Sequence, residues 1–251
     1  INQRVLRPYF QPIVDLKTLK SESFEALARW PLPDDVFIPP EDFIPLAEKS
    51  SLFLLLGDLM LETVCQQLKA FNSKAIDGFS IAVNISSEQF TEALVDRLDH
   101  LILEYDLQPQ QIGLEITESV AMKAIDSNLK LLETFRARGH KISVDDFGTG
   151  YSSLAYLKRF PLDTLKIDRA FIQELAPDTD DFIIAKAIID LGHSLGLKIV
   201  AEGVETQAQL KLLQELGCDL GQGFYFQKAS TGEMISQCYE RGLPLGRAQT
   251  L

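Results

Sequence analysis

Strand-like and helix-like segments alternate along almost the whole chain, and no linker-like segment divides them. Eight apolar runs have the character of buried strands, at 9–16, 23–30, 79–85, 112–117, 141–147, 163–168, 198–202 and 219–226. Helical periodicity separates them, near 41–71 and at 88–105, 122–138, 152–160, 180–195, 205–216 and 231–241. Such alternation is typical of a parallel sheet joined by helical crossovers. Seven strand–helix units after one extra strand predict a TIM-like α/β barrel, with a doubly wound open sheet as the alternative.

The size and charge of the chain fit one barrel domain. A barrel needs about 250 residues, and this chain has 251. Its 24 basic and 36 acidic residues give a net charge of −12, which argues against broad binding to polymeric nucleic acid or to an anionic membrane. No apolar run approaches the ~20 residues of a membrane span, and three scattered cysteines suit a reducing cytoplasm.

The first residues of the chain bear on its domain organisation. It starts at Ile1, with neither Met nor a signal-like segment. We therefore expect residues 1–251 to be a single domain excised from a longer multidomain protein, which could be membrane-anchored through segments outside this sequence. Residues 244–251 are expected to form a mobile tail.

The segment VDDFGTGYSSL at 144–154 predicts a strand that ends in a carboxylate pair, followed by a glycine-rich loop and a helix capped by Ser152 or Ser153. Neighbouring strand residues face opposite ways, so Asp145 and Asp146 can serve one site only near the end of the strand. Two carboxylates ~4 Å apart repel by ~4 kcal/mol at an effective dielectric constant of ~20. We therefore expect a positive charge between them; a simple loop cap is the alternative for an isolated Asp-Asp pair.

Each predicted strand after the first carries a polar side chain that is unusual in an apolar run: Glu25, Asn84, Glu115, Asp145 with Asp146, Lys166, Glu202 and Gln222. In a barrel, the carboxyl ends of the strands meet at one mouth, where active sites form. The three histidines lie outside these strand ends, and oxygen ligands favour Mg²⁺ or Mn²⁺. So many carboxylates suit two metal ions and in-line displacement at phosphorus, although a one-metal enolising or aldol barrel would show a similar set.

Several motifs resemble one family. They are QPIVDL at 11–16, EALARW at 25–30, VNIS at 83–86, LEITES at 114–119, VDDFGTGYSSL, LKIDR at 165–169, AEGVET at 201–206 and GQGFYF at 221–226. In this order they resemble the EAL domain family of cyclic di-GMP phosphodiesterases. The resemblance implies a modified TIM (β/α)₈ barrel with one antiparallel strand. It also implies hydrolysis of cyclic di-GMP to linear pGpG by water activated by two Mg²⁺ or Mn²⁺ ions.

The same resemblance implies roles for individual residues. One metal would be held by Glu25, Asn84, Glu115 and Asp145, and the second by Asp145, Asp146 and Glu202. Catalytic roles fall to Glu202 and Lys166, which orient or deprotonate the water, and to Glu118, which steadies the loop at 148–151. Substrate contacts fall to Arg29 at a phosphate, Gln11 at a guanine, Gln222 and Asp168; a surface salt bridge is the alternative for Arg29.

One further expectation, two departures and one alternative complete the resemblance. A homodimer is expected through the Asp-Asp loop and the helix after it, where Phe147, Tyr151 and Leu154 are equally compatible with core packing. Ala28 stands where leucine is usual, and Lys228 begins a segment that replaces the usual basic-Pro-Leu. The alternative function is a non-catalytic cyclic di-GMP receptor, but such receptors typically lack some metal ligands, and here all are present.

Overall fold

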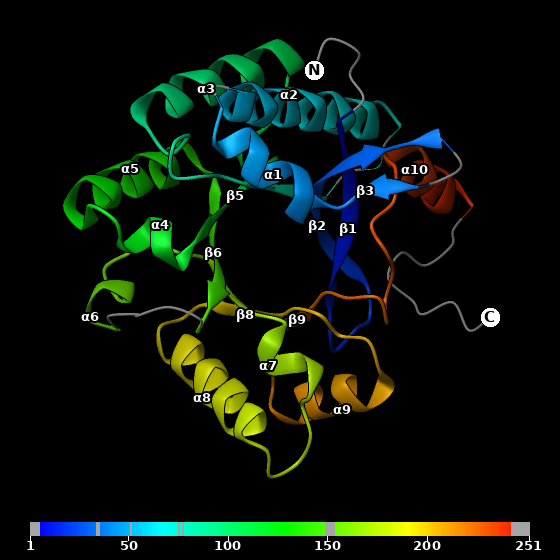
Figure 1. The fold of residues 1–251 in the computed structure, drawn as a ribbon, viewed down its shortest axis with the longest axis vertical. Coiled ribbons are helices and arrows are strands. Elements are labelled where there is room, and N and C mark those ends of the chain that lie inside the picture. Colours follow the sequence, from blue (N-terminus) through cyan, green and yellow to red (C-terminus); the bar gives the residue numbers. More distant parts are fainter. Residues whose placement is uncertain are drawn as a thin grey trace.

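A computed structural model of the chain describes residues 6–33, 36–50, 52–74, 76, 78–148 and 154–241. Its centre is a closed barrel of strands with helices packed around the outside (Figure 1). The barrel strands are β1 (Arg7–Asp15), β2 (Ser21–Pro31), β4 (Ser80–Asn84), β5 (Ile112–Thr117), β6 (Lys141–Phe147), β7 (Thr164–Ile167), β8 (Lys198–Ala201) and β9 (Leu220–Gly221).

Strand β1 closes the barrel. It pairs with β2 on one side and with β9 on the other, and both pairings are antiparallel. The remaining neighbours, from β2 through β4 to β9, pair in parallel. The prediction of a modified TIM barrel with one antiparallel strand is therefore confirmed, and the open-sheet alternative is wrong because an open sheet would leave β1 on a free edge.

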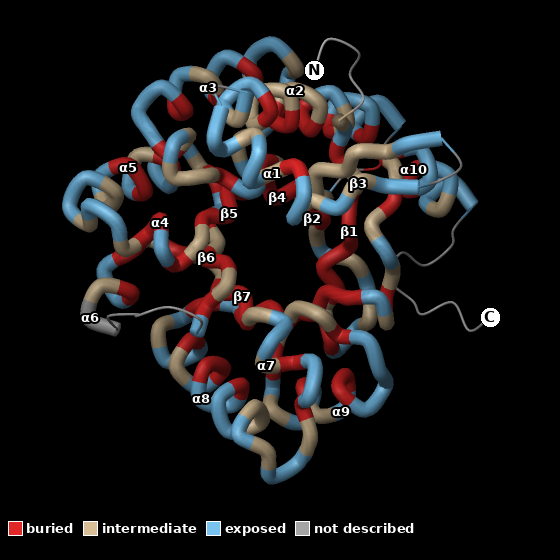
Figure 2. The backbone as a smooth tube through the Cα atoms, viewed as in Figure 1, coloured by how far each residue is buried: buried red, intermediate tan, exposed pale blue. Residues whose placement is uncertain are grey.

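Helices surround the barrel. They are α1 (Pro40–Glu48), α2 (Leu52–Ser73), α3 (Glu92–Tyr105), α4 (Glu118–Met122), α5 (Ile125–Arg138), α6 (Leu154–Leu157), α7 (Ala170–Gln173), α8 (Asp180–Ser194), α9 (Gln207–Glu215) and α10 (Gly232–Glu240), with a 3₁₀ turn η2 (Pro109–Gln111). Buried residues gather where the helices face the strands (Figure 2). The main core therefore lies between the barrel and the helices, as expected for parallel strands covered by their crossovers.

Local chemistry sets several helix ends. Helix α5 ends at Gly139, whose φ of 100° needs no Cβ, and this confirms the predicted stop. Helix α9 begins with a capping box, in which the Thr206 hydroxyl accepts a hydrogen bond from the Gln209 amide and the Gln209 side-chain oxygen accepts one from the Thr206 amide. Helix α10 begins at a Thr231 cap. The starts of α9 and α10 hold loops that follow β8 and β9 at the barrel mouth, whereas the stop at Gly139 leads into the amino-terminal end of β6.

The last strand is shorter than predicted. The sequence pattern favoured a strand over 219–226, but β9 ends at Gly221. The chain then turns against Val204, whose amide donates to the Gln222 carbonyl and whose carbonyl accepts from the Tyr225 amide. At Gly223 a Cβ would lie 2.1 Å from the Val204 carbonyl oxygen, so the two backbones approach as only glycine allows.

Three helix predictions are wrong in their boundaries. The helix expected from 88 begins at Glu92, because Ser86 accepts a hydrogen bond from the Gln89 amide at 3.3 Å and closes a separate turn. The helix expected over 122–138 begins only at Ile125, after Ala124, whose φ is 50°. Helix α6 ends at Leu157 rather than at the expected 160, and positions 152 and 153 lie outside the described residues.

Among the short elements without a counterpart in the sequence pattern, β3 and α7 lie near the site. Strand β3 (Phe37–Ile38) pairs with the end of β2 inside the expected loop at 31–40. Helix α7 follows β7. Both lie at the carboxyl ends of barrel strands, where they shape the mouth.

Other expectations fall outside the described residues or remain open. The proposed caps Ser152 and Ser153, Tyr151 and the tail at 244–251 lie outside the described residues. Phe147 is buried, which fits the core-packing alternative, and the homodimer stays a prediction. Within the described ranges, none of the helices combines the length and apolar character that crossing a membrane requires.

Candidate functional site

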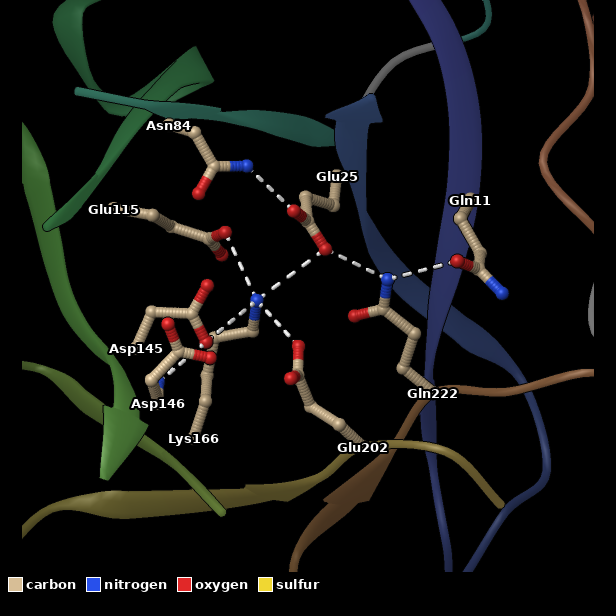
Figure 3. A network of polar contacts seen from close by, with 9 residues as sticks. All are labelled: Gln11, Glu25, Asn84, Glu115, Asp145, Asp146, Lys166, Glu202 and Gln222. Atoms are coloured by element: carbon tan, nitrogen blue, oxygen red, sulfur yellow. Dashed lines mark hydrogen bonds and ion pairs between the residues drawn. The ribbon is translucent and has the colours of Figure 1, made fainter. Parts of the chain in front are cut away.

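Polar side chains from all eight barrel strands, or from the residues just after them, converge at one end of the barrel. Figure 3 shows this group: Gln11, Glu25, Asn84, Glu115, Asp145, Asp146, Lys166, Glu202 and Gln222. The register aligns them, since Gln11 is the Cα partner of Glu25, and Asn84 is the partner of Glu115. The structure therefore brings together every residue of the predicted metal set, together with Lys166, Gln222 and Gln11.

Lys166 lies at the centre of the group. Its Nζ is 3.3 Å from Glu25 Oε2, 3.0 Å from Glu115 Oε2, 3.3 Å from Asp145 Oδ1 and 2.7 Å from Glu202 Oε1. Burial acts to lower the pKa of Lys166, but these four carboxylates outweigh it and raise the pKa well above its usual value. The ammonium group therefore supplies a positive charge beside Asp145, whereas the sequence predicted one between Asp145 and Asp146.

The backbone at Asp146 explains how two adjacent aspartates reach one site. Its φ is 54°, in the left-handed region that non-glycine residues rarely adopt. The register between β6 and β7 also shifts between Val144 and Phe147. The Asp146 amide donates to Asp145 Oδ1 at 3.0 Å. Because of this turn, the side chains of Asp145 and Asp146 no longer point to opposite faces of the strand. The left-handed backbone conformation costs about 1–2 kcal/mol.

One ammonium cannot neutralise five carboxylates, and the pKa values show this. Burial and the neighbouring Asp145 raise the pKa of Asp146 to about 6. Burial raises the pKa of Glu202 to about 8, against the opposing effect of Lys166. Burial also raises the pKa of Glu115 well above its usual value. The protein groups alone therefore leave an excess of negative charge at this end of the barrel.

Glu25 differs from the other carboxylates. Burial acts to raise its pKa, but Lys166, Gln222 and Asn84 together hold the pKa below its usual value. Asn84 Nδ2 donates to Glu25 Oε1 at 2.6 Å, and Gln222 Nε2 donates to Glu25 Oε2 at 2.7 Å. Glu25 is therefore stabilised as an anion by hydrogen bonds to both of its oxygens.

The carboxylates form two overlapping groups whose oxygens fit divalent cations. Glu25, Glu115 and Asp145 offer oxygen atoms within 4.8 Å of one another, and so do Asp145, Asp146 and Glu202. Asp145 belongs to both groups. An oxygen-only donor set with excess negative charge is the kind of site that Mg²⁺ and Mn²⁺ prefer. Asn84 fits the first group when its amide oxygen, rather than its nitrogen, faces the cation.

A chain of side-chain amides supports Glu25 from the other side. Gln11 Nε2 donates to the Gln227 carbonyl at 3.2 Å, so Gln11 Oε1 faces Gln222 and accepts from its Nε2 at 3.2 Å. Because the Gln222 amide nitrogen donates to both Gln11 and Glu25, the Gln222 Oε1 atom points away from these two side chains. That oxygen is buried, and within the described residues it has no hydrogen-bond partner. It is an acceptor available to a molecule bound at the site.

Glu118 and Asp168 lie beside the Lys166 group rather than in it. Glu118 is buried, and its Oε2 accepts a hydrogen bond from the Gly148 amide at 3.2 Å. This is the loop contact expected for it; the rest of that expectation concerns residues 149–151, outside the described residues. Asp168 Oδ1 accepts from the Ala170 amide at 2.6 Å, and its side chain helps to raise the pKa of Asp146.

An open pocket of about 310 Å³ leads to the group. Arg29 lines it, and within the described residues Arg29 has no ion-pair partner, which weighs against the salt-bridge alternative; its one side-chain hydrogen bond goes to the Ala28 carbonyl. Arg169 and Phe224 also line the pocket, and Phe224 is 60% exposed. Sequence reasoning missed both, although LKIDR and GQGFYF contain them. Glu205, whose backbone amide donates to Gln209 Oε1 at 2.8 Å, lies on the same wall.

A family model and curated relatives both match most of this chain. A family model described as the EAL domain matches residues 1–229. The chain is 45% identical over 236 residues to the bifunctional diguanylate cyclase/cyclic di-GMP phosphodiesterase MucR of Pseudomonas aeruginosa, covering 94% of this chain and 34% of MucR. It is 41% identical over 224 residues to the cyclic di-GMP phosphodiesterase NbdA of the same species, covering 89% of this chain and 29% of NbdA. The chain thus spans about a third of these curated relatives.

Solved structures show the same likeness. The PaMucR phosphodiesterase in complex with c-di-GMP superposes with a TM-score of 0.89 at 46% identity, covering 93% of this chain and 95% of that one. An EAL domain protein from Listeria monocytogenes superposes with a TM-score of 0.82 at 34% identity, covering 96% of this chain and 94% of that one.

Proposed function

Because the chain belongs to the EAL domain family, we propose that it is a metal-dependent phosphodiesterase that hydrolyses cyclic di-GMP to linear pGpG. One observation carries the proposal: the two clusters of carboxylates at the barrel mouth, Glu25 with Glu115 and Asp146 with Glu202, share Asp145. A shared carboxylate is what a paired-metal site for displacement at phosphorus requires. The relatives named as cyclic di-GMP phosphodiesterases support the choice of substrate.

The residues fit the two proposed cations in the sets expected from the sequence. Glu25, Asn84, Glu115 and Asp145 would hold one, and Asp145, Asp146 and Glu202 the other. When bound, two divalent cations of the Mg²⁺ or Mn²⁺ class lower the pKa of water and neutralise charge that develops on the phosphate. Lys166 keeps the carboxylates at a fixed spacing, since its Nζ contacts one oxygen from each of four.

The chain's own groups can guide the reaction. The Glu202 carboxylate, held by Lys166 at 2.7 Å, is placed to take the proton of the attacking water. Arg29 lies in the pocket without a carboxylate partner among the described residues, so its guanidinium is available to a phosphate. Hydrolysis breaks one bond between phosphorus and a ribose 3′-oxygen, which takes up a proton, and leaves a 5′-phosphate on linear pGpG.

Further contacts would position the nucleotide. The buried Gln222 Oε1 is an acceptor for a guanine N–H, a ribose hydroxyl or water. Gln11 fixes the orientation of that amide, a role different from the guanine contact expected from sequence, although both are compatible with its place in the pocket. Asp168 contacts Asp146 and would act on the substrate only through it.

The alternative is a receptor that binds cyclic di-GMP without cleaving it. The complete carboxylate set argues against it, because a binding module has no need to gather five carboxylates, three of them buried, around one lysine. The test is to incubate the purified domain with cyclic di-GMP and Mg²⁺ or Mn²⁺ and to follow pGpG by chromatography. We expect pGpG to form and EDTA to abolish it.

A matched pair of variants sharpens the test. Asp145→Asn removes the carboxylate that both groups share, whereas Asp190→Asn removes an exposed carboxylate on α8 that pairs with Lys186. The first should lose turnover and the second should keep it. Binding of cyclic di-GMP by the wild-type domain without turnover would favour the receptor, and failure to bind it would reject both functions.

A further inference from the structure

A second cavity opens at the opposite end of the barrel from the carboxylate group. Its volume is about 470 Å³, within the range of small-molecule sites. It enters between the amino-terminal ends of the strands, at Lys141 and Lys198, and it reaches Glu115 from behind. We call this cavity the basal well. Its wall residues are Ile13, Ser23, Ser80, Ala82, Gly113, Ser143, Thr164, Val200 and Leu220, and Glu115 is its floor.

The well exists because one part of the barrel interior is built from small residues. Ser23, Ala82, Gly113, Ser143 and Thr164 each lie two positions before a residue of the Lys166 group on the same strand, so they face the same interior. In ordinary TIM barrels, layers of Val, Ile and Leu fill this space. Here the bulky residues of the layer are confined to Ile13, Val200 and Leu220, which form an apolar cluster of their own.

The wall is polar on the side of the small residues. Hydroxyl groups of Ser23, Ser80, Ser143 and Thr164 belong to it. Within the described ranges, the structure gives none of these hydroxyls a side-chain hydrogen bond to protein. Each hydroxyl can both donate and accept. The wall therefore offers hydrogen bonds to whatever fills the well, beyond those already used by the fold.

The rim carries a surplus of positive charge on a protein whose net charge is −12. Arg136 pairs with Asp163, and Lys198 pairs with Glu22 at 2.9 Å. Lys141 is exposed, and no carboxylate of the described residues forms an ion pair with it. Three cations against two carboxylates at the rim favour an anion, whereas the carboxylate-rich mouth at the other end favours cations.

We propose that the basal well is a binding site for a small hydroxylated anion, such as a polyol phosphate or carboxylate. The anionic group lies at Lys141, and the hydroxyl groups bond to the serines and the threonine of the wall. Because the floor is Glu115, which the proposed function makes a metal ligand, an occupant of the well changes the electrostatic potential at the metal site. The well is therefore a route by which a solute regulates the catalytic end without entering it.

Cysteine accessibility tests the site without using cyclic di-GMP. Ser143→Cys places a thiol deep in the well, and Cys238→Ser removes the partly exposed native cysteine. The other native cysteines, Cys65 and Cys218, are buried, and burial raises the pKa of each to about 12, so they react slowly. The reagents are two methanethiosulfonates of similar size, one carrying a sulfonate and the other a trimethylammonium group. Ser127→Cys, exposed on α5, gives the reference ratio of their rates.

We expect the sulfonate reagent to be favoured at Ser143→Cys by about tenfold relative to the Ser127→Cys reference. Adding Lys141→Gln should remove most of this preference. Glycerol 3-phosphate should slow the labelling, and glycerol at the same concentration should not. A preference for the cationic reagent would mean entry from the carboxylate mouth, and it would overturn the proposal, as would the absence of protection by glycerol 3-phosphate. If Ser143→Cys does not fold, Ser80→Cys in the same wall carries the test, and absence of labelling there also rejects an open well.

The regulatory part has its own measurement. With Ser143→Cys labelled, Mn²⁺ binding is measured by calorimetry for the sulfonate and trimethylammonium adducts. The sulfonate adduct should bind Mn²⁺ about tenfold more tightly than the trimethylammonium adduct, because the two differ only in charge near the same site. Equal affinities would refute the coupling while leaving the well intact. Absence of Mn²⁺ binding by the unlabelled domain would instead reject the proposed function.

Discussion

Lys166→Met tests whether one buried ammonium group holds the carboxylate cluster together. Methionine keeps most of the volume of the side chain and removes the charge. The lost Nζ contacts four carboxylate oxygens at 2.7–3.3 Å, and the lysine side chain is 1% exposed. Removing one partner of a buried ion pair destabilises a protein by about 3–5 kcal/mol. For a chain of this size, at about 2–4 °C per kcal/mol, the metal-free Tm should fall by roughly 6–20 °C.

The expected loss depends on pH. The pKa of Asp146 is raised to about 6 and that of Glu202 to about 8. Between the ordinary carboxyl pKa of about 4 and these raised values, the folded metal-free protein therefore binds more protons than the unfolded chain. Its stability therefore falls as pH rises from about 4 towards 8. Lys166 itself is charged throughout this range because its pKa is raised. Without Lys166 the buried carboxyl groups must bind protons to stay neutral. At a pH above the pKa of a carboxyl group in the unfolded chain, binding each proton costs about 1.4 kcal/mol per pH unit. The variant should thus lose more stability at pH 8 than at pH 5.

The assay is thermal unfolding followed by circular dichroism, at pH 5 and pH 8, in EDTA and in excess Mn²⁺. Lys198→Met is the matched control, since Lys198 forms an exposed ion pair with Glu22, and such pairs contribute about 0–1 kcal/mol. Mn²⁺ should recover a larger part of the lost Tm in Lys166→Met than it adds to the wild type. Equal losses for the two lysine variants, or a loss at pH 8 no greater than at pH 5, would refute the electrostatic reasoning.

Three further outcomes follow from the site. Glu25→Ala and Asp145→Ala should each abolish turnover of cyclic di-GMP, beyond the ~10–100-fold loss usual for residues that only support a metal ligand, and wild-type rates in either would reject the metal assignment. Glu118→Ala should lower turnover and speed amide hydrogen exchange at Gly148, because the Glu118 carboxylate accepts a hydrogen bond from that amide. Unchanged exchange would show that Glu118 does not stabilise the loop. Arg29→Ala should raise KM with a smaller effect on kcat, and Arg29→Lys should recover part of the loss; an unchanged KM would remove Arg29 from the phosphate.

The barrel was predictable because its signal is periodic and repeated. Each of the eight strand-like runs became a strand, and the polar residue near each strand end marked the side where the site lies. Helix stops such as Gly139 were also readable, since a left-handed residue there has a local chemical cause. Local patterns of this kind survive in the fold because they agree with the burial that the barrel imposes.

Other features depended on contacts between distant segments. The end of β9 was misjudged because Gly223 turns against the backbone of Val204, and nothing in GQGFYF reveals that neighbour. The turn at Asp146 was also hidden, since the φ of 54° there accompanies a register shift between β6 and β7, which are distinct segments of the chain. Arg169 and Phe224 were missed as pocket residues because their loops meet only in three dimensions.

The sequence by itself determined the alternation of strands and helices, the inventory of carboxylates and the single lysine among them. These are properties of side-chain chemistry and spacing, and they hold wherever the chain lies. Tertiary structure decided that Lys166 contacts four carboxylates at once, that Gln11 orients Gln222, and that small residues leave a well behind Glu115. Closure of the barrel by the antiparallel β1 sets these distances, because it places Gln11 beside Glu25 and against Gln222, which is 211 residues away along the chain.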